Sequence, residues 1–315
     1  MADEIDIAII GAGPAGLAAG VYAARGDRKT AIFERNILGG QIATTGDVEN
    51  YPGFPEGVNG LDLALAMQAQ AERFGAEIRY EHVTGIKPGA EGSPFILNTE
   101  DGQELSAKAV IVTAGADYNK LGVPGELELV GKGVSYCATC DAAFFRNVPV
   151  IIVGGGDAAV DEAIFTTRYA SKVYLVHRRE ELRATRLLQD RLFANEKIEV
   201  IWNTVVETIN GDDAVTSATL KNIVTGETRD LPVDAVFIFV GQTPNTSVLR
   251  GLVPLDPGGH AIVDLWMQTP VPGLFVAGDI RAEAARQLVS AAGDGATAAI
   301  RAEHYIADHY GAPGV

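Results

Sequence analysis

The sequence predicts an α/β protein that contains two Rossmann-like, dinucleotide-binding units. The first observation is a short β-branched strand that runs into the glycine-rich turn GAGPAG and an alanine-rich helix. The second is the return of this pattern as VPVIIV, GGGDAA and another helix. The third is spacing, because Gly11 to Glu34 and Gly154 to His177 each span 23 residues. Such a repeat indicates two copies of one β-α-β unit.

Length and composition fit this class and limit the possible partners. The 315 residues suffice for two domains, and 47% of them are hydrophobic. A formal net charge of -16 argues against nucleic-acid and anionic-membrane partners. No apolar run approaches the roughly 20 residues that span a bilayer. The acidic start MADEIDIAII lacks the basic region of a secretory signal, so we expect a cytoplasmic protein.

The elements of the first unit follow from local pattern. Residues 5–10 predict a buried strand, a helix follows to about Arg25, and TAIFE predicts a second strand that ends at Glu34. Further on, PFILNTEDGQELSAKAVIVTAGA is typical of a hairpin with a buried strand. GLFVAGD predicts another buried strand, and residues 285–310 predict one long helix or two.

The second unit repeats the sequence of elements. Residues 148–153 predict a strand, residues 158–169 a helix, and KVYLVH the next strand. More β segments follow, and the last of them is AVFIFVGQTPN. We expect the chain to cross between the two units at residues 116–118 and 241–243.

The two glycine-rich turns are candidate phosphate-binding loops. Glycine lets the backbone approach a pyrophosphate, and the following helix N-terminus supplies amides and a positive dipole. A single such motif is weak, since it can be a turn without a ligand, but here each copy has the expected strand and helix. The candidate residues are Gly11, Gly13, Pro14, Ala15 and Gly16 in the first loop, and Gly154, Gly156, Asp157 and Ala158 in the second.

The second strands of the two units end differently. Glu34 suits a ribose hydroxyl pair and would repel a 2′-phosphate. The second unit instead offers a basic cluster, and guanidinium groups bind phosphate bidentately. This contrast predicts adenosine with a free ribose in one unit and NADPH in the other. The alternative is a solvated helix start with ion pairs to Glu180 and Glu181. The cluster consists of His177, Arg178, Arg179 and Arg183.

Three residues near the C-terminus are candidates for contact with a flavin. Asp279 follows a buried strand and could bind a ribityl hydroxyl, although a Gly-Asp pair is also ordinary turn chemistry. Arg286 and Gln287 precede the last helix, and the Gln287 amide could bond the pyrimidine edge.

The only two cysteines of the chain are Cys137 and Cys140, in SYCATCD. If a helix starts here, with Ser135 or Tyr136 near its cap, both sulfurs lie on one face and can meet. A redox dithiol competes with two buried inert thiols and with a zinc site, which would need two more ligands. Asp141 could cap the helix or shuttle a proton to a thiolate.

Together these motifs resemble the low-molecular-weight thioredoxin reductase family. They are GAGPAG, GGQ, DVENYPGF, CATCD, GGGDAAVDEA, HRREELR, FVGQTPN, and GLFVAGD followed by ARQ. They occur in the family's order over nearly the whole chain. Small departures are Ala142 after CATCD, where the family often has glycine, Ala159 in the second loop, and TAGA at 113–116.

The resemblance implies two three-layer domains, the second inserted in the first. Residues 1–116 and 244–315 would form an FAD-binding domain, and residues 117–243 an NADPH-binding domain that carries the cysteines and rotates against it. It also implies a homodimer whose partner is thioredoxin. Further FAD contacts would come from Gly39, Gly40, Gln41, Asn50, Ala114 and Gly115.

The resemblance also assigns the catalytic roles. Cys140 would face the flavin, Cys137 would attack the thioredoxin disulfide, and Asp141 would act as acid and base. Three other functions compete: a flavin dithiol oxidase that reduces oxygen, a reductase for another carrier, and a flavoprotein redox sensor. The arginine cluster counts against the oxidase, which needs no 2′-phosphate site.

Overall fold

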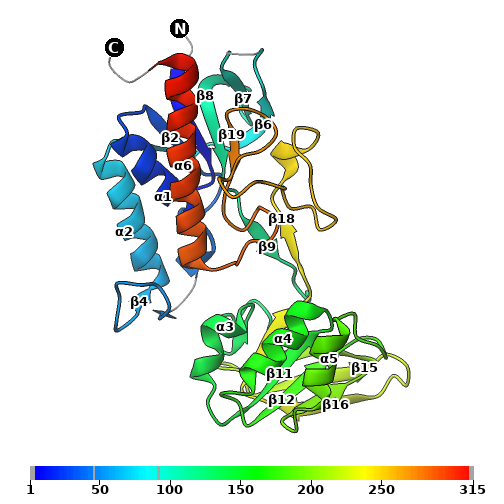
Figure 1. The fold of residues 1–315 in the computed structure, drawn as a ribbon. Helices are drawn as coiled ribbons and strands as arrows, with labels where there is room; N and C mark the ends of the chain where they lie inside the picture. Colours follow the sequence, from blue (N-terminus) through cyan, green and yellow to red (C-terminus); the bar gives the residue numbers. More distant parts are fainter. Residues whose placement is uncertain (1–3, 45–46, 91–92, 312–315) are drawn as a thin grey trace. The chain divides into compact units, whose positions relative to one another are not determined.

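The computed structural model describes residues 4–44, 47–90 and 93–311. The chain divides into two compact units, which Figure 1 shows in sequence colours. The first comprises Met1–Asp117 and Thr243–Val315, and the second Tyr118–Gln242. Two short paired strands, β9 (Ala116–Tyr118) and β18 (Gln242–Pro244), carry the chain across the division.

The first unit is organised by a seven-stranded sheet. Its order is β5-β2-β1-β8-β7-β6, and β19 also pairs with β8. The pairs β1–β2, β1–β8, β2–β5 and β8–β19 are parallel, whereas β7 pairs antiparallel with β6 and β8, which confirms the predicted hairpin. The strands are β1 (Glu4–Ile10), β2 (Thr30–Phe33), β5 (Glu77–Arg79), β6 (Val83–Lys87), β7 (Phe95–Thr99), β8 (Glu104–Val112) and β19 (Leu274–Val276).

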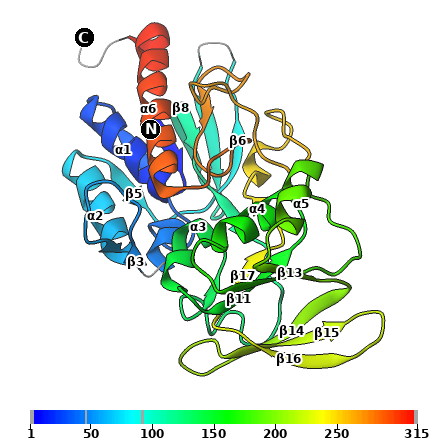
Figure 2. The same ribbon diagram turned by 60° about the horizontal axis from the view of Figure 1, so that its bottom comes forward.

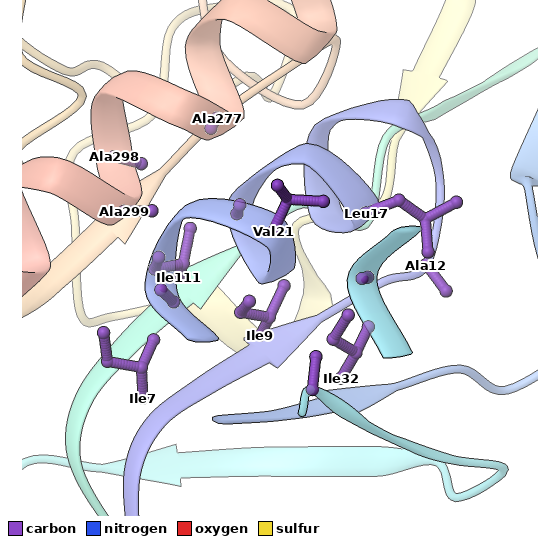
Figure 3. Close-up of a cluster of buried hydrophobic side chains, with 14 of the residues drawn as sticks. Ile7, Ile9, Ala12, Leu17, Val21, Ile32, Ile111, Ala277, Ala298 and Ala299 are labelled. Atoms are coloured by element: carbon purple, nitrogen blue, oxygen red, sulfur yellow. The ribbon is translucent and has the colours of Figure 1, made fainter. Parts of the chain in front are cut away.

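Three helices form a layer on this sheet, with the core between them. Figure 3 shows Ile9 and Ile111 of the sheet packed among side chains of the helices, such as Leu17 and Ala298. The helices are α1 (Pro14–Arg25), α2 (Gly60–Arg73) and α6 (Leu288–Tyr310), which is a single helix. Smaller elements are η1 (Gly40–Thr44), β3 (Asp47–Val48), β4 (Val58–Asn59) and η3 (Ser247–Leu249).

The second unit has a parallel five-stranded sheet between two layers. Helices pack on one face, and an antiparallel sheet, β14-β15-β16, packs on the other (Figure 2). The five-stranded sheet is ordered β10 (Val134–Ser135), β17 (Ala235–Phe239), β11 (Pro149–Gly154), β12 (Lys172–Val176) and β13 (Ile198–Ile201). The other elements are α3 (Ala138–Asp141), η2 (Ala142–Phe144), α4 (Asp157–Thr166), α5 (Arg186–Phe193), β14 (Thr204–Asn210), β15 (Ser217–Asn222) and β16 (Thr228–Pro232).

The internal repeat is visible in the strand pairing. Ile7 pairs with Thr30 and Val150 pairs with Val173, so the offset between partners is the same in both units. In each unit the strand before the glycine loop, β1 or β11, lies in the middle of the sheet, with the strand after the following helix on one side. The α/β class with parallel, Rossmann-type sheets is confirmed. Across the described ranges, no helix is long and apolar enough to cross a membrane.

Candidate functional site

The first glycine loop is shaped for close approach by a ligand. Gly11 has a φ of 113°, and a Cβ there would lie 2.6 Å from the Thr113 carbonyl oxygen, so only glycine fits. A Cβ at Gly16 would lie 1.8 Å from the Gly11 oxygen. At Gly13, by contrast, a Cβ would meet open space. The helix α1 begins after Gly13 without a side-chain cap, so its first amides remain available to a phosphate.

Glu34 lies just after β2, half-buried beside this loop. Its Oε2 accepts a hydrogen bond from the Ala12 amide at 2.9 Å, and its Oε1 accepts one from the Asn36 amide at 2.7 Å. These bonds fix the carboxylate, and each oxygen keeps a second lone pair for a ribose hydroxyl. Glu34 also lines a cavity of about 60 Å³ together with Gly11 and Ala114.

The other candidates for flavin contact lie around the same loop. The Gly39 amide donates to the Ala12 oxygen at 2.8 Å, and a Cβ at Gly40 would lie 3.4 Å from Gly13 Cα. The Gln41 side chain donates to the Ala116 oxygen.

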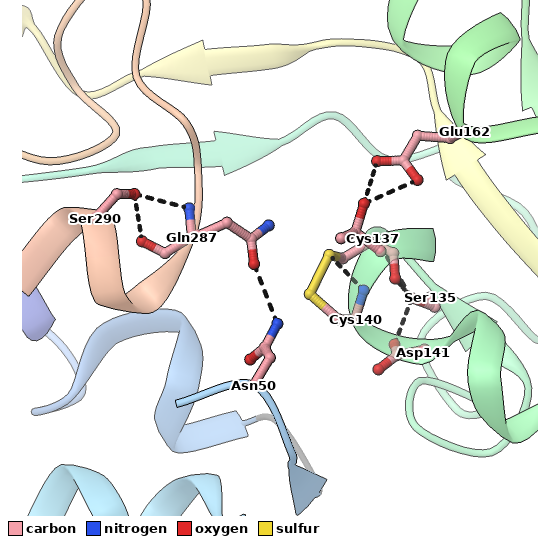
Figure 4. Close-up of a disulfide and its surroundings, with 9 residues drawn as sticks. Asn50, Ser135, Cys137, Cys140, Asp141, Glu162, Gln287 and Ser290 are labelled. Atoms are coloured by element: carbon pink, nitrogen blue, oxygen red, sulfur yellow. Dashed lines mark hydrogen bonds between the residues drawn. A yellow bond between two sulfur atoms is a disulfide. The ribbon is translucent and has the colours of Figure 1, made fainter. Parts of the chain in front are cut away.

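Further contacts join the segment after β8 to Asn245, and Asn50 to the start of α6. Asn245 Nδ2 donates to the Ala114 oxygen at 2.9 Å, and its amide donates to the Gly115 oxygen at 3.0 Å. Asn50 Nδ2 donates to Gln287 Oε1 at 3.2 Å, as Figure 4 shows. Each of these contacts joins chain segments of the first unit that are far apart in sequence.

Asp279 provides an unusual polar group. Its Oδ1 is buried and has no hydrogen-bond partner among the described residues. Burial raises the pKa of this carboxyl, and the nearby Arg286 opposes the rise. The preceding residue, Gly278, lies against the start of α1, because a Cβ there would be 3.0 Å from Ala15 Cβ. A buried acceptor without a donor is costly, so this oxygen fits a ligand hydroxyl group.

The second glycine loop resembles the first in its geometry. A Cβ at Gly154 would lie 2.5 Å from Ala159 Cβ, and one at Gly156 would meet open space. The helix α4 also starts without a side-chain cap at Gly156. The Asp157 carboxylate accepts from the Thr185 amide at 2.6 Å, which ties the loop to the segment after β12. Ala158 is exposed in the first turn of α4.

The His177 side chain packs against the backbone of this loop. Its ring is buried, and a Cβ at Gly155 would lie 2.2 Å from it, so the ring packs on the loop backbone. Its Nε2 lies 3.0 Å from the backbone carbonyl oxygen of Glu181. Burial lowers the pKa of His177, so the neutral ring is favoured. His177 therefore helps to hold the loop in place and does not add a positive charge to it.

The arginines of the cluster are exposed and carry no ion pair to a described residue. The segment after β12 is not helical, because α5 begins only at Arg186. The alternative of a helix start with ion pairs to Glu180 and Glu181 is therefore wrong. Unpaired guanidinium groups beside an uncapped helix N-terminus favour a phosphate ligand. They belong to Arg178, Arg179 and Arg183.

Cys137 and Cys140 form a disulfide with a Cα–Cα distance of 5.3 Å. The expectation that a helix starts here with Ser135 or Tyr136 near its cap is confirmed, because the N-cap residue of α3 is Cys137, which directly follows Tyr136. Ser135 belongs to β10, so the sheet holds it extended and the helix begins later. The Cys140 amide points at Cys137 Sγ at 3.2 Å, and such a donor stabilises a thiolate more than a thiol.

Asp141 is the last residue of α3 and does not cap its start, so the capping hypothesis is wrong. Its side chain makes no cap bond to the following turn either. The carboxyl instead accepts a hydrogen bond from the Ser135 hydroxyl at 2.5 Å (Figure 4). Burial raises the pKa of Asp141, and the Ser135 hydrogen bond lowers it. A carboxyl poised in this way can exchange a proton with a neighbouring group.

A disulfide on a scaffold of two Rossmann-type sheets, each with a glycine-rich loop, is typical of a pyridine-nucleotide-dependent disulfide oxidoreductase. The family model for pyridine nucleotide-disulphide oxidoreductases matches residues 5–296. The thioredoxin reductase of Listeria monocytogenes is 48% identical, covering 96% of this chain and 93% of the relative. That of Bacillus subtilis is 46% identical, covering 96% and 94%. The crystal structure of thioredoxin reductase from Streptococcus pyogenes matches with a TM-score of 0.93 and 44% identity, covering 98% of this chain and 100% of that one.

The chain therefore belongs to the thioredoxin reductases of the pyridine nucleotide-disulphide oxidoreductase family. It is an enzyme, and membership implies a flavin and a pyridine nucleotide as cofactors. The cysteine pair is consistent with the redox-active disulfide of such an enzyme.

Sequence reasoning missed three contacts near these groups. Asn245 holds the turn after β8, although it lies in the recognised motif FVGQTPN. Thr139 Oγ1, between the two cysteines, donates to Glu162 of α4 at 3.0 Å. Ser135 contacts Asp141, six residues away. No local pattern marks these contacts, because each depends on how separate elements pack.

Proposed function

We propose that this chain is an NADPH-dependent thioredoxin-disulfide reductase that uses FAD. The observation that supports it most directly is the Cys137–Cys140 disulfide, which has an amide aimed at one sulfur and a half-buried carboxyl in the next residue. A structural staple would need neither group. The two unlike nucleotide loops supply the rest of the argument.

FAD is assigned to the first unit. Its glycine loop and uncapped α1 suit the pyrophosphate, and Glu34 suits the adenosine ribose. The unpartnered Asp279 oxygen suits a ribityl hydroxyl. We assign the remaining contacts to Gly39, Gly40, Gln41, Asn50, Ala114, Gly115, Arg286 and Gln287.

NADPH is assigned to the second unit. The uncapped start of α4 suits its pyrophosphate, and the unpaired Arg178, Arg179 and Arg183 suit its 2′-phosphate. His177 holds the loop in place beneath them. When bound, these cofactors supply the electron pair that reduces the disulfide.

The residues of the SYCATCD segment then carry out thiol–disulfide exchange. The Cys137 thiolate attacks one sulfur of the thioredoxin disulfide, which forms a mixed disulfide and expels the other sulfur as a thiolate. Asp141 gives that thiolate a proton. The Cys140 thiol next gives its proton to Asp141 and attacks Cys137 Sγ. The second thioredoxin sulfur leaves as a thiolate and takes that proton from Asp141, so that reduced thioredoxin is released and the Cys137–Cys140 bond is restored. Cys140 is the sulfur that we assign to the flavin side.

From the family resemblance we also propose that the protein works as a homodimer in the cytoplasm. Light scattering on the purified flavoprotein would test the dimer.

The decisive experiment for the function is anaerobic titration with NADPH, followed by addition of a bacterial thioredoxin. Sustained NADPH consumption with formation of thioredoxin thiols is expected. Consumption sustained by oxygen without thioredoxin would instead identify a dithiol oxidase, and a single stoichiometric reduction would identify a redox sensor.

Replacing Asp279 should weaken flavin binding. Asp279→Ala removes the buried acceptor, and a hydrogen bond to a charged group contributes about 1.5–3 kcal/mol, so we expect the Kd for FAD to rise at least about tenfold. Quenching of flavin fluorescence during titration of the apoprotein measures this. Asp62→Ala, which removes an exposed carboxylate on α2, is the control and should leave the Kd unchanged. An unchanged Kd in Asp279→Ala would remove Asp279 from the FAD site.

A further inference from the structure

The Ser135 hydroxyl lies between the Asp141 carboxyl and the backbone of Cys137 (Figure 4). Its Oγ is 2.5 Å from Asp141 Oδ2 and 3.3 Å from the Cys137 carbonyl oxygen. It also accepts a hydrogen bond from the Cys137 amide at 3.0 Å. One hydroxyl thus joins the carboxyl to the residue that carries the attacking sulfur.

The sheet holds Ser135 in a fixed position for these contacts. It is the last residue of β10, pairs with Phe237 of β17, and is only 6% exposed. Asp141, by contrast, ends a helix of four residues, which has little stability of its own. The sheet therefore fixes the serine, and the serine fixes the carboxyl.

The hydroxyl can serve the carboxyl whether or not it is protonated. A serine hydroxyl has one hydrogen to donate and two lone pairs that accept. When Asp141 is ionised, Ser135 donates to Oδ2 and accepts from the Cys137 amide. When Asp141 is protonated, the carboxyl donates to Oγ, and the serine hydrogen turns to the Cys137 carbonyl oxygen. Both arrangements leave each group with a partner, and Ser135 neither gains nor loses a proton.

We propose that Ser135 is a positioning residue that holds the Asp141 carboxyl in place in both of its protonation states during thiol–disulfide exchange. This rests on the proposed role of Asp141 as acid and base. A group that must give and take a proton in each cycle is held best by a partner that can both donate and accept. A backbone N–H or an ammonium group in this place could only donate, so it could not accept the hydrogen bond of the protonated carboxyl.

The test is the pH dependence of thioredoxin reduction by the flavin-loaded enzyme with NADPH. The relevant limb of the profile is the one that Asp141→Asn abolishes. Ser135→Ala removes the partner of both forms of the carboxyl, but the hydrogen bond to the ionised form is the stronger, so the apparent pKa of that limb should move up by about one unit. Ser135→Thr keeps the hydroxyl and should restore the limb. An unshifted limb in folded, flavin-loaded Ser135→Ala would overturn the proposal.

Thr99→Ala is the matched control. Thr99 is also a buried hydroxyl that bonds an aspartate carboxylate, Asp101, but it lies in the β7–β8 hairpin of the first unit. This variant should leave the limb in place. A shift as large as that of Ser135→Ala would show a general effect of losing a buried hydroxyl, and would overturn the proposal.

Infrared difference spectra supply a readout that does not depend on turnover. The C=O stretch of protonated Asp141, identified by its loss in Asp141→Asn, should show a hydrogen-bonded carboxyl in the wild type and a free one in Ser135→Ala. A free carboxyl in the wild type overturns the proposal even if the alanine variant fails to fold. If Asp141→Asn keeps the wild-type pH profile, the proposed catalytic role of Asp141 fails, and the infrared band alone decides whether Ser135 holds the carboxyl.

Discussion

Replacing the attacking sulfur by a hydroxyl, Cys137→Ser, should lower thioredoxin turnover by at least about a thousandfold, because loss of a catalytic nucleophile has effects of this size or larger. Reduction of the bound flavin by NADPH should be retained, since neither nucleotide loop includes Cys137. Stopped-flow absorbance of the flavin measures the first half of the reaction, and steady-state NADPH consumption measures the whole. Retained turnover would show that electrons do not reach thioredoxin through the cysteine pair.

The companion variant Cys140→Ser distinguishes the two sulfurs. It leaves Cys137 free to attack thioredoxin but removes the thiol that resolves the mixed disulfide. A covalent complex with thioredoxin should therefore accumulate with Cys140→Ser and not with Cys137→Ser, which non-reducing gel electrophoresis or mass spectrometry will show. The opposite pattern would reverse the roles of the two sulfurs.

Reversing the charge of one arginine in the cluster should raise the KM for NADPH by about tenfold to a hundredfold. A charged hydrogen bond contributes about 1.5–3 kcal/mol, and each 1.4 kcal/mol corresponds to a factor of ten. We expect Arg178→Glu to show this increase and to keep its FAD content, because Arg178 belongs to the second unit. The wild type should prefer NADPH to NADH, and the variant should lose most of that preference.

The control for this variant is Arg229→Glu. Arg229 lies exposed on β16 of the same unit, so the control makes the same change in net charge outside the cluster. Its KM for NADPH should stay at the wild-type value. Loss of flavin from Arg178→Glu would mean that the two nucleotide assignments are exchanged. Equal kcat/KM of the wild type for NADPH and NADH would remove the 2′-phosphate role of the cluster.

Much of the fold could be predicted from local sequence. The strand, glycine turn and helix of each unit lie within a few residues of their predicted bounds, because hydrophobic periodicity and positive-φ glycines act over short distances. Boundaries were less accurate: α4 ends at Thr166 rather than near Tyr169, and residues 288–310 form one helix. The start of α3 lies just after Ser135 and Tyr136, as expected, and the pairing of β10 with β17 holds Ser135 in the sheet.

Some features of the candidate site could also be predicted from the sequence, and others could not. Spacing alone determined that Cys137 and Cys140 could meet, since only two residues lie between them along the chain. The contrast between Glu34 and the arginine cluster was also visible, because each follows the second strand of its own repeat. Their assigned roles in binding remain predictions.

What the sequence by itself determined is therefore the repeated α/β framework, its glycine turns and the membership of the cysteine pair in a redox motif. Only the tertiary structure decided that Ser135 faces the Asp141 carboxyl and that Asp279 keeps a buried oxygen without a partner in the described part of the chain. The physical reason is that local pattern governs backbone dihedrals and the face on which a side chain lies. The partner and burial of a polar group depend on elements that meet only when the sheets and helices pack.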